Sequence, residues 1–142
     1  MSYLMIEGGR PLHGRITVQC AKNSVLPILA ATLLAGDVCR ITACPRLSDV
    51  DTASDILRHL GCAVCWEGSD LVVDTTHITR CDIPEALMRK MRSSVIFLGA
   101  ILSRCSQAEL SYPGGCELGP RPIDLHLTAL RTLGAEINEV GG

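Results

Sequence analysis

Aromatic residues and excess charge are both scarce in this sequence. Trp, Tyr and Phe make up 3% of the 142 residues, too few for the stacking platforms that bind single-stranded nucleic acid. The formal net charge is −2, and no dense run of Lys and Arg provides an electrostatic footprint for nucleic acid or a membrane surface. We therefore expect neither nucleic acid nor a membrane among the partners.

A secretory leader and a long apolar run are also missing. Residues 1–7 carry no basic stretch, and the longest apolar segment, residues 25–35, is interrupted by Pro27 and Thr32. A helix that spans a bilayer needs about 20 apolar residues. Hydrophobic residues nevertheless make up 47% of the chain, enough to bury a core. These features predict a soluble, cytoplasmic protein.

Cysteine, by contrast, is plentiful. Eight cysteines stand at positions 20, 39, 44, 62, 65, 81, 105 and 116. Without a signal peptide we expect them to be reduced thiols. Cys62 and Cys65 form a C-x-x-C, but the segment predicts a strand, which would point the two side chains to opposite faces. We interpret them as small core residues and expect no metal and no cofactor; a zinc or redox module remains a third alternative.

The sequence contains an internal repeat. Residues 21–36 align with 91–106 at an offset of 70, and residues 50–61 align with 123–134 at an offset of 73. The second copy therefore has three extra residues, in the segment that holds Cys116. A period this long indicates a duplicated α/β unit. Among the matched positions, Lys22 falls on Arg92, Ser24 on Ser94, and Leu57-Arg58 on Leu130-Arg131.

Both copies predict an apolar helix opened by a polar cap, a short strand, an amphipathic helix stopped by a glycine, and a further strand. The fold class is therefore α/β (α+β), built from β-α-β-α-β-β units, with about two units over residues 21–89 and 90–142. Residues 4–7 and 15–19 flank a Gly/Pro-rich turn and predict a hairpin. The other expected elements are helices from Asn23 or Ser24 to about Leu34 and from Ser93 or Ser94 to about Ser103, strands over 38–42 and 108–112, helices over 50–60 and 123–133 ended by Gly61 and Gly134, and strands over 63–66, 70–74 and 136–140.

Three cations stand at predicted helix starts. Lys22 and Arg92 each precede a helix N-terminus, where free N–H groups and the helix dipole favour an anion. Arg121 lies near the start of a third helix. Their equivalent positions suggest a polyanionic ligand, and the alternative is three solvated surface charges.

The segment from Pro113 to His126 is the other candidate site. Three glycines and three prolines within residues 113–122 exclude a helix or a strand through Cys116, which places this thiol on a surface loop near Arg121. A thiol with the reference pKa of about 8.5 can act as an acid, whereas a neighbouring arginine favours the nucleophilic thiolate. Both roles stay open, as does a simple tight turn that holds a small residue.

The strings Ala21-Lys22-Asn23-Ser24, Met91-Arg92-Ser93-Ser94, Leu47 to Thr52 and the 113–126 loop resemble the UDP-N-acetylglucosamine enolpyruvyl transferases. The resemblance implies transfer of the enolpyruvyl group from phosphoenolpyruvate to the 3'-hydroxyl of UDP-N-acetylglucosamine, with release of phosphate, in the first committed step of peptidoglycan synthesis. It implies two domains, each an inside-out α/β barrel of three units. Residues 1–20 would be a strand hairpin of the second domain, and residues 21–142 an incomplete catalytic domain. The chain would then need the missing C-terminal portion of the same enzyme and be inactive alone.

The resemblance also implies roles for particular residues. Cys116 would be the loop thiol that donates a proton and forms an adduct with fosfomycin. Ile96 departs from the family, where many members have a tryptophan. Catalytic roles fall to Cys116, Lys22 and Arg121, and substrate-binding roles to Lys22, Asn23, Arg92, Arg121, Pro122, Ile123, Asp124 and Leu125.

Two alternatives remain beside this function. One is the sister family that makes 5-enolpyruvylshikimate 3-phosphate, against which the Cys116 loop argues. The other is a non-catalytic fragment that binds a nucleotide sugar.

Overall fold

The computed structural model describes residues 3–18, 20–111 and 122–139. In this part the chain is a mixed α/β structure, as the sequence predicts. Its elements in chain order are α1 (Lys22–Ala35), β1 (Val38–Ile41), α2 (Ser48–His59), β2 (Ala63–Glu67), β3 (Asp70–Asp74), β4 (Asp82–Ile83), α3 (Glu85–Lys90), the 3-10 helix η1 (Arg92–Ile96), α4 (Phe97–Cys105), β5 (Glu109–Leu110) and α5 (Asp124–Thr132).

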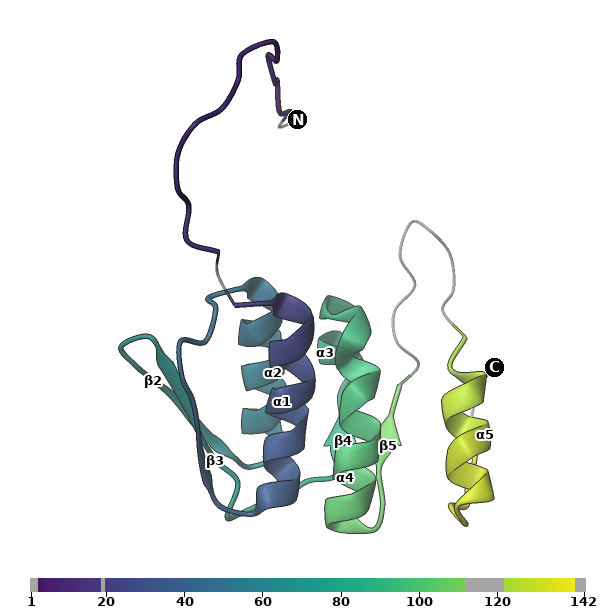
Figure 1. Cartoon of the computed structure of the whole chain (residues 1–142). Helices are drawn as coiled ribbons and strands as arrows, with labels where there is room; N and C mark the ends of the chain where they lie inside the picture. The colour runs from purple at the N-terminus through teal and green to yellow at the C-terminus, as the bar shows by residue number, and fades with distance from the viewer. Residues whose placement is uncertain (1–2, 19, 112–121, 140–142) are drawn as a thin grey trace.

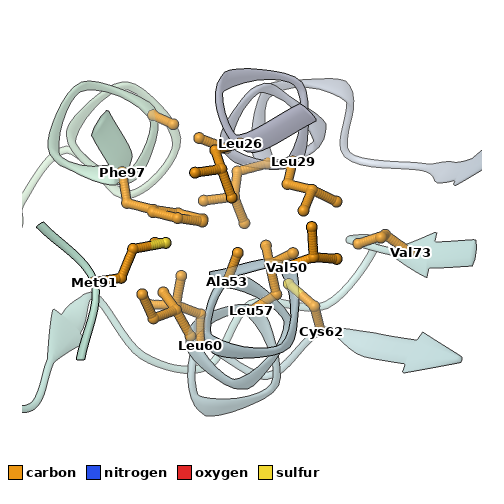
Figure 2. Packing of buried hydrophobic residues seen from close by; sticks show 14 of the residues in the cluster. Leu26, Leu29, Val50, Ala53, Leu57, Leu60, Cys62, Val73, Met91 and Phe97 are labelled. Carbon is orange, nitrogen blue, oxygen red and sulfur yellow. The ribbon is translucent and has the colours of Figure 1, made fainter. Parts of the chain in front are cut away.

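An antiparallel sheet covers one side of α1 and α2 (Figure 1). Its strand order is β1-β3-β2, and Cys39 and Val64 both lie opposite Val73 in the central strand. Side chains alternate between the two faces of a strand, and in β3 Leu71 and Val73 are fully buried. Val73 extends from the sheet toward Val50 of α2 (Figure 2).

A second, smaller sheet consists of β4 and β5. The two strands are parallel, with Asp82 opposite Glu109 and Ile83 opposite Leu110. Parallel neighbours need a crossover connection, which α3, η1 and α4 supply. Helix α1 packs against both α2 and α4, and so joins the two halves of the described chain.

The core fills the space between these helices and the larger sheet. Phe97 of α4, Leu29 of α1 and Leu57 of α2 are fully buried and meet near Ala53, whose small side chain lets the helices approach (Figure 2). Burying a large apolar side chain contributes about 1.5–3 kcal/mol. This cluster packs α1 against α2 and α4.

Helix ends have matching conformations at the repeat offsets. Helix α1 ends at Gly36 and α4 ends at Ser106, 70 residues later, and both residues are left-handed, with φ of 63° and 61°. Helices α2 and α5 end in the same Schellman motif. In the first, Cys62 N donates to Leu57 O at 3.0 Å, and in the second Ala135 N donates to Leu130 O at 3.0 Å.

The described residues form no strand at three of the predicted strand segments, whereas the pairing of residues 1–20 with a second domain stays a prediction. Residues 4–7 and 15–18 form no strand and are exposed, and residue 19 lies outside the described part. A two-stranded hairpin is marginal by itself, and no described strand pairs with this segment. Residues 136–139 of the predicted strand 136–140 also form no strand, and Val140 lies outside the described part.

Several other elements differ in extent from the prediction. The strand predicted over 108–112 is reduced to β5 in the described residues. The helix predicted from Ser93 or Ser94 begins as η1 and continues as α4 to Cys105. Sequence reasoning missed β4 and α3, which are two and six residues long and too short to show a hydrophobic period.

Candidate anion site at the helix N-termini

The first turns of α1 and α2 are joined by an ion pair. Lys22 Nζ lies 2.6 Å from Asp49 Oδ2. The lysine side chain is 52% exposed and the aspartate side chain 23% exposed, so the cation lies at the surface and its partner lies deeper. Lys22 occupies the first position of α1 rather than the position before it, a difference within the usual uncertainty of helix boundaries.

Backbone donors are available beside this pair. The N-cap residues of α1, α2 and α5 are Ala21, Leu47 and Ile123, and none of the three makes a side-chain cap hydrogen bond. Helices leave their first N–H groups without intrahelical partners, so an apolar N-cap leaves these donors for water or a ligand. Such a helix end is a favourable place for a phosphate or carboxylate.

The helix N-termini gather at one end of the molecule. Helices α1, α2 and α5 begin at the upper end of the view in Figure 1 and run downward. At the opposite end, the Arg104 guanidinium in the last turn of α4 lies against Gly36, which follows the last turn of α1. Helices α1 and α4 are therefore parallel, which brings Lys22 and the start of η1 at Arg92 to the same end.

The structure places the remaining predicted residues as follows. Asn23 follows Lys22 in the first turn of α1 and is exposed. Pro122 and Ile123 precede α5, and Asp124 and Leu125 form its first turn, with Leu125 85% exposed. Cys116 and Arg121, the predicted loop thiol and its neighbouring cation, lie outside the described residues.

Two further residues bear on the site, although neither was among the predicted site residues. Asp49 is a residue that sequence reasoning missed as part of the site; an acidic side chain in a helix's first turn was the available signal. Ile96, the departure from the resembled family, is half-buried and packs against the hydrophobic core.

The described thiols are free, and two of them are buried. Burial raises the pKa of the Cys44 thiol. Burial, with a smaller contribution from Asp74, raises the pKa of Cys62 to about 11, so this thiol stays protonated and inert at neutral pH. Cys62 belongs to the core whereas Cys65 is exposed, which confirms the predicted opposite faces. Within residues 3–18, 20–111 and 122–139, no group of three metal-ligating side chains comes together.

A groove of about 1280 Å³ lies elsewhere, between the β4–β5 pair, α3, α4 and α5. On its wall Asp82 lies 2.9 Å from His59 Nε2 and 2.9 Å from Arg80 Nε. The hydrogen bonds from Arg80 and His59 lower the pKa of Asp82 to about 2. Glu85 and Arg89 form another ion pair on its rim. Of the predicted site residues that the structure describes, only Ile123 lines this groove.

In the described part of the chain, every helix falls short of the length and hydropathy that a membrane crossing needs.

Comparison with known proteins identifies the class. The model of the EPSP synthase (3-phosphoshikimate 1-carboxyvinyltransferase) family matches residues 6–142, and the chain belongs to this family. In structure it is similar to the enolpyruvyl transferase NikO from Streptomyces tendae, with a TM-score of 0.61 and 27% identity over 68% of this chain and 23% of that one.

The relatives that match the chain at high identity belong to one group within this family by name. The chain is 51% identical to UDP-N-acetylglucosamine 1-carboxyvinyltransferase 2 of Caldanaerobacter subterraneus subsp. tengcongensis over 100% of its own length and 34% of that protein. It is 51% identical to UDP-N-acetylglucosamine 1-carboxyvinyltransferase of Deinococcus deserti over 98% of its own length and 33% of that protein. The resemblance to this group is confirmed, and the chain spans about a third of the length of these relatives.

Proposed function

We propose that these residues form part of the active site of an enzyme that transfers the enolpyruvyl group of phosphoenolpyruvate to the 3'-hydroxyl of UDP-N-acetylglucosamine. The observation that carries the proposal is the 51% identity to a UDP-N-acetylglucosamine 1-carboxyvinyltransferase along the whole chain. The sister activity on a shikimate phosphate is the less supported function, because relatives named for UDP-N-acetylglucosamine match at this level. Cytoplasmic location and a role in peptidoglycan synthesis belong to the same proposal.

The chemistry requires stabilisation of negative charge. The vinyl carbon of phosphoenolpyruvate takes up a proton, and the sugar hydroxyl gives up its own proton to a base as its oxygen adds to the neighbouring carbon. Phosphate then leaves as the vinyl group is restored by loss of a proton. Cations and N–H donors aimed at the developing charge are effective in such a step. Lys22 and the first turn of α1 supply one cation and free backbone donors on the described side of the site.

The loop and the start of α5 are assigned to the remaining roles. Cys116 would donate the proton or react as a nucleophile, with Arg121 beside the phosphate. Asn23 and Arg92 would contact the sugar, and the segment from Arg121 to Leu125 the uridine. The exposure of Asn23 and of Leu125 supports these assignments, since both side chains are free to meet a ligand or another part of the protein.

The 142-residue chain by itself is expected to be inactive. It spans 34% of the length of a similar transferase, and large apolar side chains such as Leu125 and Leu133 are 85% and 83% exposed. Exposed apolar surface of this kind marks a place for another part of the protein. In our proposal the missing portion completes an inside-out barrel and a second domain, with residues 1–20 paired in the latter. A chain that binds the nucleotide sugar without turnover is the outcome we expect for the isolated segment.

The test is a chimera that joins residues 1–142 to the remaining two thirds of the Caldanaerobacter relative. Phosphate release with both substrates is measured for this protein, for Lys22→Ala and for Lys90→Ala. Lys90 is the other lysine of the sequence and is an exposed residue at the end of α3. We expect Lys22→Ala to lose about 100-fold or more in turnover, the usual effect of removing one donor from a charge-stabilising site.

The melting temperature of each variant serves as the control for folding in this experiment. An exposed ion pair contributes about 0–1 kcal/mol, so Lys22→Ala is expected to lower Tm by no more than about 4 °C. Lys90→Ala is expected to match the unmodified chimera in both measurements. A large loss of Tm in Lys22→Ala would show a structural role, and a chimera without turnover would refute the proposed function.

A further inference from the structure

The pair of Lys22 and Asp49 is placed unlike the other ion pairs of the described residues. Its partners come from the first turns of two different helices, whereas each of the other pairs has a partner in a strand or a loop, or lies within one helix. The two residues are 27 positions apart in sequence and meet at 2.6 Å. The contact therefore fixes where one helix N-terminus presents its cation relative to the other.

Asp49 is the fixed member of the pair. Its side chain is the less exposed of the two, and it lies in the first turn of α2, where the helix dipole stabilises a carboxylate. Directly after it, Val50 and Ala53 are fully buried and hold α2 in the core. Lys22 instead has a flexible four-carbon side chain, with about 2 kcal/mol of rotamer entropy to lose when it is held.

We propose that Asp49 is a positioning residue for the transfer reaction, which holds the Lys22 ammonium over the N-terminus of α1. This inference rests on the proposed function of Lys22 at the donor phosphate. An ammonium has three N–H donors, so one hydrogen bond to Asp49 leaves two for the phosphate. The carboxylate orients the cation before the donor arrives, and orientation of this kind supplies a large part of enzymatic rate.

The negative charge of Asp49 has an opposite effect on binding. A carboxylate next to Lys22 repels an incoming phosphate and weakens ground-state affinity for it. Removal of the charge therefore has a distinctive kinetic signature. Asp49→Asn is expected to lower kcat about tenfold while KM for phosphoenolpyruvate stays the same or falls, and KM for the sugar nucleotide is unchanged. A merely structural role would not split kcat from KM in this direction.

Kinetics of the chimera form the first arm of the test. Asp51 provides the matched control, because it is an exposed acidic residue in the same first turn of α2. We expect Asp51→Asn to keep the unmodified kcat, and Asp49→Asn to add no loss in a Lys22→Ala background, since residues that act through each other are not additive. A kcat within twofold for Asp49→Asn, or the same tenfold loss in the Lys22→Ala background, would overturn the inference.

Amine labelling of the 142-residue chain forms the second arm and needs no activity. Trace acetic anhydride is applied, and the acetylation of Lys22 relative to Lys90 is measured by mass spectrometry; these are the two lysines of the sequence. Asp49→Asn is expected to raise the Lys22 to Lys90 ratio about threefold, since the Lys22 amine must leave its contact with Asp49 before it reacts and an exposed pair contributes about 0–1 kcal/mol. Asp51→Asn is expected to leave the ratio unchanged. An unchanged ratio in Asp49→Asn would overturn the inference.

The two arms also separate this inference from the proposed function. A chimera that turns over but shows no effect of Asp49→Asn refutes the positioning role alone. A chimera without turnover refutes the proposed function, and the labelling ratio then decides whether Asp49 holds Lys22.

Discussion

Two glycines at matching helix ends allow a prediction whose magnitude follows from the structure. Gly61 after α2 and Gly134 after α5 both have left-handed backbone, with φ of 107° and 97°. A Cβ on Gly61 would lie 2.6 Å from Thr79 Oγ1 and 2.9 Å from Thr79 N, whereas a Cβ on Gly134 would meet nothing within 4 Å. Thr79 cannot easily move away, because its N–H donates to Leu60 O at 2.9 Å.

Alanine at the two sites should therefore have unequal costs. The left-handed conformation costs a non-glycine residue about 1–2 kcal/mol, and this applies to both sites. Forcing a methyl group into a packed site adds about 1–3 kcal/mol, and this applies to Gly61 alone. We expect Gly134→Ala to lose about 1 kcal/mol and Gly61→Ala about 3 kcal/mol, or roughly 2–4 °C and 6–12 °C in Tm for a chain of this size.

Thermal and urea unfolding of the 142-residue chain, followed by far-UV circular dichroism, measures both variants. The helices preceding the two glycines also differ in packing, since α5 buries Leu127 alone whereas α2 buries six residues. This difference acts in the same direction. Equal losses of stability in the two variants would refute the claim that the approach of Thr79 decides the cost at Gly61.

Three further predictions concern single side chains. Asp82 has a pKa lowered to about 2 by Arg80 and His59, so its contribution is present above the unfolded pKa near 4 and is lost as the pH falls from about 4 to 2. Because the carboxyl group is partly exposed, we expect Asp82→Asn to lose about 1–2 kcal/mol at pH 7 and to flatten the acid limb of a stability–pH curve; an unaltered limb would contradict this. Ser106→Gly should gain up to about 1 kcal/mol, because serine there holds a left-handed φ of 61°, and a lower Tm would count against that reasoning. Burial and the raised pKa of Cys62 predict that alkylating reagents modify the exposed Cys65 before Cys62. In the chimera we expect fosfomycin to modify Cys116; peptide mapping that finds Cys62 modified ahead of Cys65 or Cys116 would show the reasoning to be wrong.

The elements of the first half could be predicted closely because their signals are local. The strand predicted over 70–74 is β3 residue for residue, and the strand predicted over 63–66 is β2 with one more residue. Gly61 marks the end of α2 through its left-handed conformation, which few other residues adopt. The prediction that Cys62 and Cys65 face opposite sides is confirmed for the same reason, since alternation along a strand depends on the backbone alone. The interpretation of both as core residues is wrong for Cys65, which is exposed.

The failures depend on partners that a local pattern cannot show. Residues 15–18 alternate polar and apolar side chains in a way that suits a strand, but a strand forms only where another strand offers its N–H and C=O groups, and none does so in the described part of the chain. The candidate anion site was likewise predicted only in its local part. Lys22 could be chosen from the sequence because it stands at a helix start, whereas its pairing with Asp49 needs the packing of α1 on α2.

The uncapped helix ends connect the fold to the proposed chemistry. A side-chain N-cap stabilises a helix by about 1 kcal/mol, and α1, α2 and α5 have Ala21, Leu47 and Ile123 at that position. The other described helices also lack a side-chain cap bond, so what distinguishes α1 and α2 is the cation of Lys22 that lies beside their first turns. N–H groups without a side-chain partner in these first turns can bind the phosphate of a substrate. We therefore place the phosphoenolpyruvate site there rather than in the groove between α3, α4 and α5.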